Sequence, residues 1–118
     1  MTITNAATKP TIIPDVIIGI QSFLDKNYST DISLDLLAKT FSISKYHMAR
    51  EFKRYLGKSP IDYLIDVRID RAKTLLTDSG RSVADICQLV GIPNPNHFLY
   101  LFKEREGVTP SAFRKFQL

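Results

Sequence analysis

Four side chains between residues 44 and 58 have the chemistry to contact phosphate oxygens and the edges of nucleobases. On a helical wheel at 100° per residue they share one face, and they are Tyr46, Ala49, Arg50 and Lys53. A guanidinium fork matches guanine or phosphate in a bidentate way, and an ammonium suits phosphate as a point charge. A solvated basic face would have the same composition, so the surrounding elements must decide between the two interpretations.

The residues themselves delimit the helix that carries this face. Ser44 can accept a hydrogen bond from the free amides of the first turn, and Gly57 can adopt the left-handed conformation that ends a helix. Apolar side chains recur at i, i+4, i+7 and i+8, and they are Met48, Phe52, Tyr55 and Leu56. Residues 42–60 therefore predict an amphipathic helix with an apolar inner side and a basic outer side.

Two helices are predicted before the basic one. Apolar periodicity indicates a helix from about Pro14 to Lys26 or Asn27, and a second helix capped by Ser33 or Asp31. A short break at residues 42–43 separates the second helix from the basic one. Helix, tight turn and helix is the helix-turn-helix arrangement, in which the second helix enters the major groove of DNA.

A long helix is predicted to follow. Ser59 can cap it, Pro60 suits its first position, and its periodicity continues to about Thr77. About eighteen residues at 1.5 Å each make a rigid spacer of about 27 Å. Some carboxylates lie outside its apolar stripe and predict a solvated face, and they are Asp62, Asp66 and Asp70.

Arg68 falls on the apolar stripe of this long helix. A guanidinium in that position needs an internal hydrogen-bond acceptor. We expect Arg68 to act as a structural brace, and we suggest Asp85 as one partner.

The second half of the chain repeats the first, in residues of the same kind 50 positions apart. The pairs are Phe52 and Phe102, Gly57 and Gly107, Ser59 and Thr109, Pro60 and Pro110, Tyr63 and Phe113, and the two caps Ser44 and Asn94. By the same offset, the outward residues of the second basic helix are Asn96, Leu99, Tyr100 and Lys103. Asn96 could pair with adenine, and Leu99 could either meet a thymine methyl group or pack sideways.

Composition favours a polyanion as partner and excludes several other classes of function. Five basic residues stand against one acidic residue in 44–58, and four against two in 101–118, so these two blocks carry all of the positive excess and the rest of the chain is slightly acidic, for a net charge of +4. A single cysteine, Cys87, lies in an apolar pattern and is expected to be a small buried hydrophobe. Two histidines form no metal cluster, and no cofactor-binding motif is present. No set of residues suggests an enzyme, and no apolar run could span a membrane, so we expect a cytoplasmic protein.

With these residues in place, the chain resembles the DNA-binding domain of the AraC/XylS family of bacterial transcription regulators. The resemblance rests on Gly-Lys-Ser-Pro and Gly-Val-Thr-Pro after the two basic helices, on GIPNPNHFLYLFKEREGVTPSAFR, and on YLIDVRIDRAKTLL in the long helix. It covers about residues 14–116. The chain departs from the family where Leu99 and Tyr100 replace the polar residue and arginine often found there.

The expected fold is all-α and homeodomain-like, with about seven helices. We divide it into a tail or linker remnant (1–13), a first helix-turn-helix subdomain (14–58), a linker helix (59–78) and a second helix-turn-helix subdomain (79–118). The resemblance implies a sequence-specific transcription regulator, an activator at promoter sites, associated with the nucleoid and with RNA polymerase as a candidate partner. No effector domain is expected within the chain.

The resemblance implies base contacts from both outward faces. Lysines and the amides near the two caps would hold phosphates, and His97 would contact the flanks or backbone of the site. The predicted DNA-contacting residues are Ser44, Lys45, Tyr46, Ala49, Arg50, Lys53, Asn94, Asn96, His97, Leu99, Tyr100 and Lys103. The alternative is a helical protein-interaction module whose basic faces dock an acidic partner.

Overall fold

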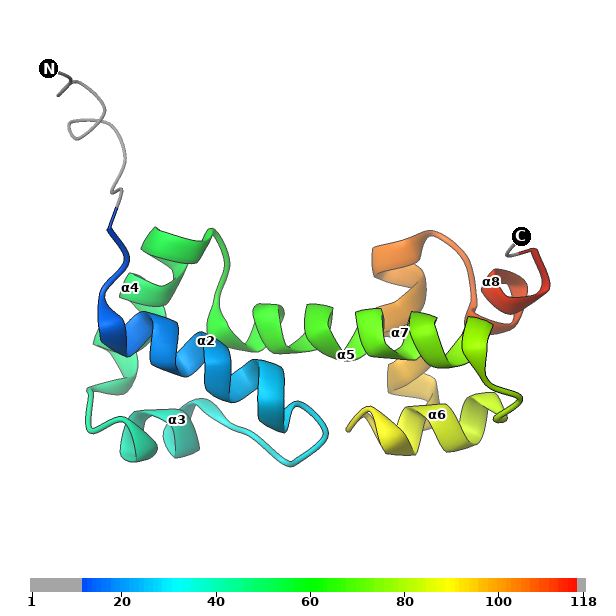
Figure 1. Cartoon of the computed structure of the whole chain (residues 1–118), viewed down its shortest axis with the longest axis horizontal. Coiled ribbons are helices and arrows are strands. Elements are labelled where there is room, and N and C mark those ends of the chain that lie inside the picture. The colour runs from blue at the N-terminus through cyan, green and yellow to red at the C-terminus, as the bar shows by residue number, and fades with distance from the viewer. Residues whose placement is uncertain (1–11, 117–118) are drawn as a thin grey trace, which may run out of the picture.

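The computed structural model describes residues 12–116 of the 118-residue chain. Within this range it contains seven helices and no strand, which confirms the all-α fold (Figure 1). The helices are α2 (Asp15–Asn27), α3 (Leu34–Thr40), α4 (Lys45–Leu56), α5 (Pro60–Asp78), α6 (Val83–Leu89), α7 (Pro95–Glu106) and α8 (Pro110–Phe116). The tail predicted for residues 1–13 lies almost wholly outside the described residues.

Side-chain caps begin most of these helices, as the sequence predicts. Each capping oxygen accepts a hydrogen bond from the amide three residues further on, at 3.0–3.2 Å, and the caps are Ser33, Ser44, Ser59, Ser82 and Asn94. Of the two residues considered for the start of α3, the cap is therefore Ser33. Gly57 and Gly107 end the two basic helices in the left-handed conformation, with φ of 85° and 80°.

Two apolar cores lie at the two ends of α5. The first core consists of Ile17, Ile20, Leu24, Ile32, Leu37, Met48, Phe52 and Leu64, and the second of Ile69, Ala72, Leu76, Ile86, Cys87, Val90, Ile92, Phe98, Leu101 and Phe102. The helix α5 thus contributes Leu64 to one core and Ile69 to the other, and it spans both halves (Figure 1). Cys87 is 1% exposed, as expected for a buried hydrophobe, and burial raises the pKa of its thiol.

The turn inside each helix-turn-helix has the same geometry. The amide of Ile43 donates to the carbonyl of Ala38 at 3.0 Å, and the amide of Ile92 donates to that of Cys87 at 3.0 Å. A residue with positive φ precedes each of these amides, and it is Ser42 (53°) in the first turn and Gly91 (89°) in the second. The internal repeat therefore extends to backbone conformation.

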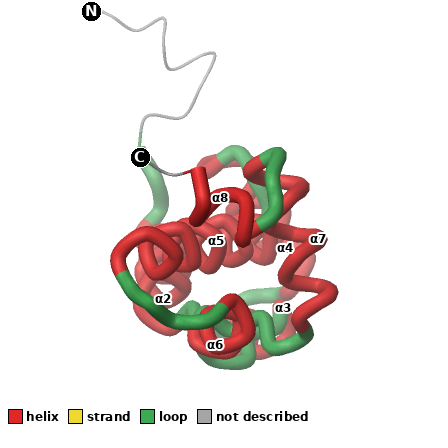
Figure 2. Tube along the Cα trace, turned by 90° about the vertical axis from the view of Figure 1, so that its right-hand side faces the viewer, coloured by secondary structure: helices red, strands yellow, loops and turns green. Residues whose placement is uncertain are grey.

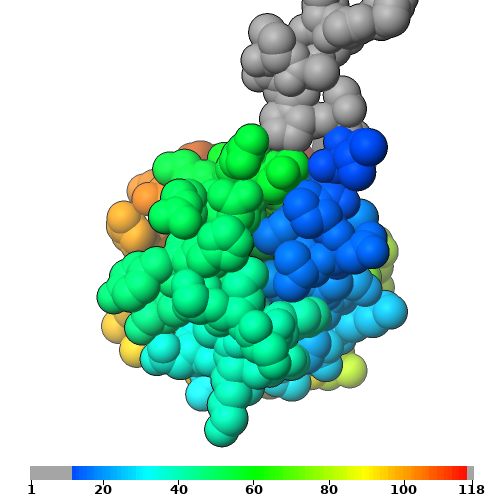
Figure 3. Space-filling model, turned by 90° about the vertical axis from the view of Figure 1, so that its left-hand side faces the viewer, coloured from blue at the N-terminus to red at the C-terminus, as the bar shows by residue number. Residues whose placement is uncertain are grey.

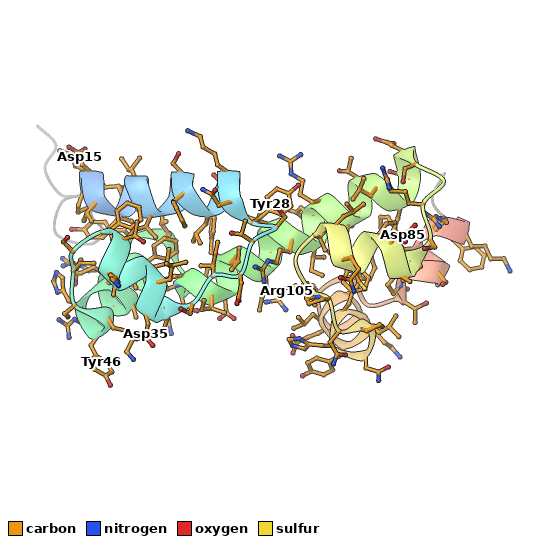
Figure 4. All side chains as sticks on the ribbon, turned by 90° about the horizontal axis from the view of Figure 1, so that it is seen from below. Asp15, Tyr28, Asp35, Tyr46, Asp85 and Arg105 are labelled. Carbon is orange, nitrogen blue, oxygen red and sulfur yellow. The ribbon has the colours of Figure 1, made fainter. Side chains whose placement is uncertain are left out.

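Arg68 acts as a brace, but the suggested pairing with Asp85 is wrong. Its Nε donates to the carbonyl of Tyr28 at 2.6 Å and its Nη2 donates to the carbonyl of Thr30 at 2.7 Å. Asp85 lies on α6, well away from Tyr28 (Figure 4). The main-chain carbonyls just after the end of α2 need hydrogen-bond donors, and the guanidinium of Arg68 on α5 provides two of them.

The prediction that the carboxylates of α5 form only a solvated face is also wrong in part. Asp66 accepts a hydrogen bond from Arg105 Nε at 2.8 Å and another from Lys58 Nζ. Arg105 Nη2 also lies 3.9 Å from Asp62. Two of these three carboxylates therefore take part in ion pairs, and the third, Asp70, has no ion pair within the described residues.

Candidate nucleic-acid interface

The helices α4 and α7 lie on the same side of α5. Figure 2 looks towards the second half of the molecule and shows both helices on one side of α5, with α2 on the other. Figure 3 looks from the opposite end and shows α4 with the orange surface of the second half visible beyond it at the same edge. The 19 residues of α5 separate the two helices along its axis. One elongated partner could therefore contact both.

Core packing turns the predicted face of α4 outward. Met48 and Phe52 are fully buried, so the opposite side of the helix faces solvent. Tyr46 is 79% exposed and points away from the molecule (Figure 4). Arg50 and Lys53 are also exposed, and Ala49 is half-buried beside them. The structure brings these four predicted residues together on one surface.

Neighbouring side chains orient two of the cations of α4. Arg50 Nη2 lies 3.4 Å from Nδ1 of His47, one turn earlier. Lys45 Nζ forms an ion pair with Asp35 of α3 at 3.0 Å, and this hydrogen bond raises the pKa of Lys45. Lys45 would therefore meet a phosphate with part of its charge already offset by Asp35.

The outward side of α7 is less basic. Its predicted residues Asn96, Leu99, Tyr100 and Lys103 are all exposed, with Leu99 at 40% and Tyr100 at 63%. The hydroxyl of Tyr100 donates to Glu104 Oε2 at 3.2 Å. The predicted site does not include Glu104 as an acidic neighbour of the outward residues of α7. The i, i+4 spacing of Tyr100 and Glu104 could have indicated this contact.

The two helices differ in charge. Four basic residues and one acidic residue lie on α4, whereas α7 has two of each. On α7, Arg105 is paired with Asp66, and Glu106 is paired with Lys73 at 3.1 Å. Lys103 is therefore the main cation on the outward side of α7, and attraction for a polyanion is concentrated at α4.

Ser44 and Asn94 stand at the starts of the two helices. Their side-chain oxygens accept from the amides of His47 at 3.1 Å and His97 at 3.0 Å. Other amides of the first turn have no partner within the helix and point outward, where they can bind phosphate. His97 and Asn94 also line a hollow of about 320 Å³ between the two halves.

No group of three or more His, Cys, Asp or Glu side chains within residues 12–116 is arranged to hold a metal ion. None of the helices in this range is long and apolar enough to cross a membrane.

Comparison with known proteins agrees with this geometry. The family model described as a helix-turn-helix domain matches residues 37–115. A solved structure from Chromobacterium violaceum, a transcriptional regulator described as AraC-type, superposes with a TM-score of 0.78 at 27% identity, covering 86% of this chain and 90% of that one. This chain belongs to the AraC/XylS family.

Its AraC-family relatives are named as transcription regulators. The bifunctional transcriptional activator and DNA repair enzyme AdaA of Bacillus subtilis is 38% identical over 81% of this chain and 46% of its own length. The regulator YdiP of Escherichia coli is 36% identical over 91% of this chain and 34% of its own length. This AraC-family chain thus spans less than half the length of either relative.

Solved structures share the AraC-type fold over most of the chain. The C-terminal domain of the response regulator AraT from Geobacillus stearothermophilus has a TM-score of 0.88 at 25% identity, covering 92% of this chain and 90% of that one. The DNA-binding domain of AdpA, solved in complex with its target DNA, has a TM-score of 0.82 at 24% identity, covering 86% and 92%.

Proposed function

We propose that this chain binds double-stranded DNA sequence-specifically and regulates transcription by placing α4 and α7 in successive major-groove segments. The observation that carries the proposal is the exposure of two equivalent helices on one side of the long helix α5 (Figure 2). Recognition helices that read one face of a duplex should meet half-sites about one turn, roughly 10 base pairs, apart. Residues 14–58 and 79–118 then act as two reading units, and 59–78 act as the spacer.

The outward residues divide into two roles. Lys45, Lys53 and Lys103, with the amides near Ser44 and Asn94, hold phosphates and supply a salt-dependent affinity. Arg50 makes a bidentate contact to guanine, and Asn96 pairs with adenine. Tyr46, Ala49, Leu99 and Tyr100 supply apolar and hydroxyl contacts to base edges, and His97 contacts the flank of the second half-site.

Activation is the regulatory direction that the names of the relatives support, since AdaA is called a transcriptional activator. An activator at a promoter would meet RNA polymerase, which we propose as a protein partner, and it would work at the bacterial nucleoid in the cytoplasm. The proposal includes no catalytic step for this chain.

The test begins with selection of duplexes from a random library by the parent protein. We expect two half-sites about 10 base pairs apart. Inserting two alanines after Val67 turns the second half by about 200° around α5 and should abolish specific binding, while circular dichroism shows helices as before. Unchanged footprints after the insertion would show that the halves bind independently.

The recognition face is tested by two substitutions on α4. Arg50→Ala should cost about 1 to 3 kcal/mol and relax the preference at one base, whereas Lys53→Ala should weaken all sequences and lower the salt slope by about one. Arg71→Ala, which removes an exposed cation from α5, serves as the control. Equal binding by Arg50→Ala and the parent on every sequence would show that the assigned face is wrong.

A second candidate function is a helical interaction module in which the basic face of α4 docks an acidic protein, while the neutral α7 adds apolar contacts. Leu99 and Tyr100 are exposed beside a carboxylate, which suits a protein surface as well as a base pair. A helical interaction module for an acidic protein would bind no duplex in a mobility-shift assay at moderate salt, whereas the DNA-binding protein would.

A further inference from the structure

We propose that Asp66 is a positioning residue that holds α4 and α7 in the one relative orientation that lets both helices engage the same duplex. The inference rests on the proposed function, because it concerns how the two reading units act together. It assigns a role to a side chain that contacts neither helix's outward face.

Asp66 accepts hydrogen bonds from both halves of the molecule. Its Oδ1 receives Arg105 Nε at 2.8 Å, and its Oδ2 receives Lys58 Nζ. Lys58 follows Gly57, the residue that ends α4, and Arg105 lies in the last turn of α7. A single carboxylate therefore gathers the C-terminal ends of the two proposed recognition helices.

The position of Asp66 on α5 gives this contact its importance. The last side chain that α5 buries in the first core is Leu64, and the first that it buries in the second core is Ile69. No residue of 65–68 is fully buried, so this stretch is a joint between two separately packed units. Apolar packing within each core does little to set the angle between them, whereas charge-assisted hydrogen bonds are directional.

The other contacts near the joint do not replace Asp66. Arg105 Nη2 also approaches Asp62, one turn earlier on α5, but only to 3.9 Å. Arg68 donates to Tyr28 and Thr30, which belong to the first half. Gly91 of the second half packs against Tyr28, since a Cβ on Gly91 would lie 2.8 Å from the carbonyl oxygen of Tyr28. That contact is a pivot between the turns that precede α3 and α7. Asp66 prevents rotation about it by holding the opposite ends of the recognition helices.

The contact is partly shielded from solvent, and its hydrogen bonds continue to the outward face of α7. The side chain of Arg105 is only 19% exposed and that of Asp66 is 32% exposed. Arg105 Nη1 also donates to Glu104 Oε1 at 3.1 Å, and Glu104 Oε2 accepts from Tyr100. Hydrogen bonds from Lys58 and Arg105 outweigh the effect of burial and hold the pKa of Asp66 below its ordinary value, so the carboxylate is charged at neutral pH.

Simultaneous binding of two half-sites depends on this geometry. The second contact gains from a high effective concentration only when both helices fit the duplex together. A looser joint should therefore reduce affinity for the complete site and leave each isolated half-site unaffected.

The experiment compares Asp66→Asn with the matched control Asp70→Asn. Asp70 lies one turn later on α5, is exposed, and has no ion pair among the described residues. Asp70→Asn therefore makes the same change in net charge without removing a contact between the two halves. Both variants are titrated against the duplex selected by the parent, against duplexes with one half-site scrambled, and against duplexes with the spacing changed by one base pair.

We expect Asp66→Asn to bind the complete site about three- to tenfold more weakly than Asp70→Asn, and to bind single half-sites within about twofold of it. The preference for one spacing should also become weaker. Equal losses on complete and single sites, or no loss at all, would overturn the positioning role.

A second arm needs no DNA. Spin labels are attached to Lys53→Cys on α4 and Lys103→Cys on α7, while the buried Cys87 remains unlabelled. Asp66→Asn should broaden the distribution of distances between the labels, and Asp70→Asn should not. If the parent selects no DNA, the proposed function fails, and the label distances alone decide the role of Asp66. An unchanged distribution would refute it.

Discussion

The guanidinium of Arg68 donates to the main-chain carbonyl of Tyr28 at 2.6 Å, across 40 residues of sequence. A second hydrogen bond reaches Thr30 at 2.7 Å. The loop between α2 and α3 is thereby attached to the middle of α5.

Arg68→Met should lower the free energy of unfolding by about 2 kcal/mol, because it leaves two carbonyls without their charged donor. Urea unfolding measures the change, with Arg81→Met as the control for loss of a cation. A double-mutant cycle of Arg68 with Asp85 should show no coupling beyond about 0.3 kcal/mol. A larger coupling would restore the pairing that the structure rejects.

Ser42 occupies a left-handed position, with φ of 53°, where the second turn has Gly91. This conformation costs a residue with a Cβ about 1 to 2 kcal/mol, and glycine avoids most of that cost although it gains freedom in the unfolded chain. Ser42→Gly should therefore stabilise the protein by about 0.5 to 1 kcal/mol in urea unfolding.

The reverse substitution should have a larger effect of opposite sign. In Gly91→Ser, the new Cβ would meet the carbonyl oxygen of Tyr28 at 2.8 Å and Ser29 Cα at 3.1 Å, in addition to the backbone cost. We expect a loss of at least about 2 kcal/mol. Equal and small effects at both positions would show that the two turns are not strained as described.

Local signals explain why the helices could be predicted. A cap such as Ser44, a terminating glycine such as Gly57 and the buried positions Met48 and Phe52 all act within one helix, so their spacing in sequence is their spacing in space. The outward face of α4 follows directly from the inward one. The repeat then extends the same prediction to α7.

Contacts between elements could not be predicted in the same way. Arg105 and Asp66 are 39 residues apart, and their meeting depends on how α7 crosses α5. Lys45 and Asp35 lie on different helices, so no helical period links them. The sequence could indicate that Arg68 needed an acceptor, but main-chain carbonyls such as that of Tyr28 carry no residue-type signal. The candidate site was therefore predictable as two faces, but the contacts that orient them were not.

The contribution of Asp66 to stability should depend on pH. Its pKa is lower in the folded protein than its ordinary value, so the ionised form favours folding. This contribution is fully present above the unfolded pKa of about 4 and is lost as the pH falls through the lower folded value.

We therefore expect Asp66→Asn to be less stable than the parent by up to about 1 kcal/mol at pH 7, a modest value because the network is partly solvated. The difference should shrink below about pH 4. Urea unfolding of both proteins between pH 3 and pH 7 provides the measurement, and Asp70→Asn should show no such convergence. A difference that persists at pH 3 would contradict the ion-pair origin.

Asp35 restrains a cation that the proposed interface needs. Lys45 Nζ is paired with Asp35 at 3.0 Å, and the carboxylate also repels phosphates that approach the start of α4. Asp35→Asn should release Lys45 and tighten binding about two- to fivefold on every duplex, because phosphate contacts carry no sequence information. Asp15→Asn is the control, since Asp15 also lies in the first turn of a helix but is on the side away from Tyr46 (Figure 4). Mobility-shift titrations on the selected site and on unrelated DNA measure both variants. A gain in affinity confined to the selected site would assign Lys45 to base reading. An equal gain from Asp15→Asn would show that the effect comes from net charge alone.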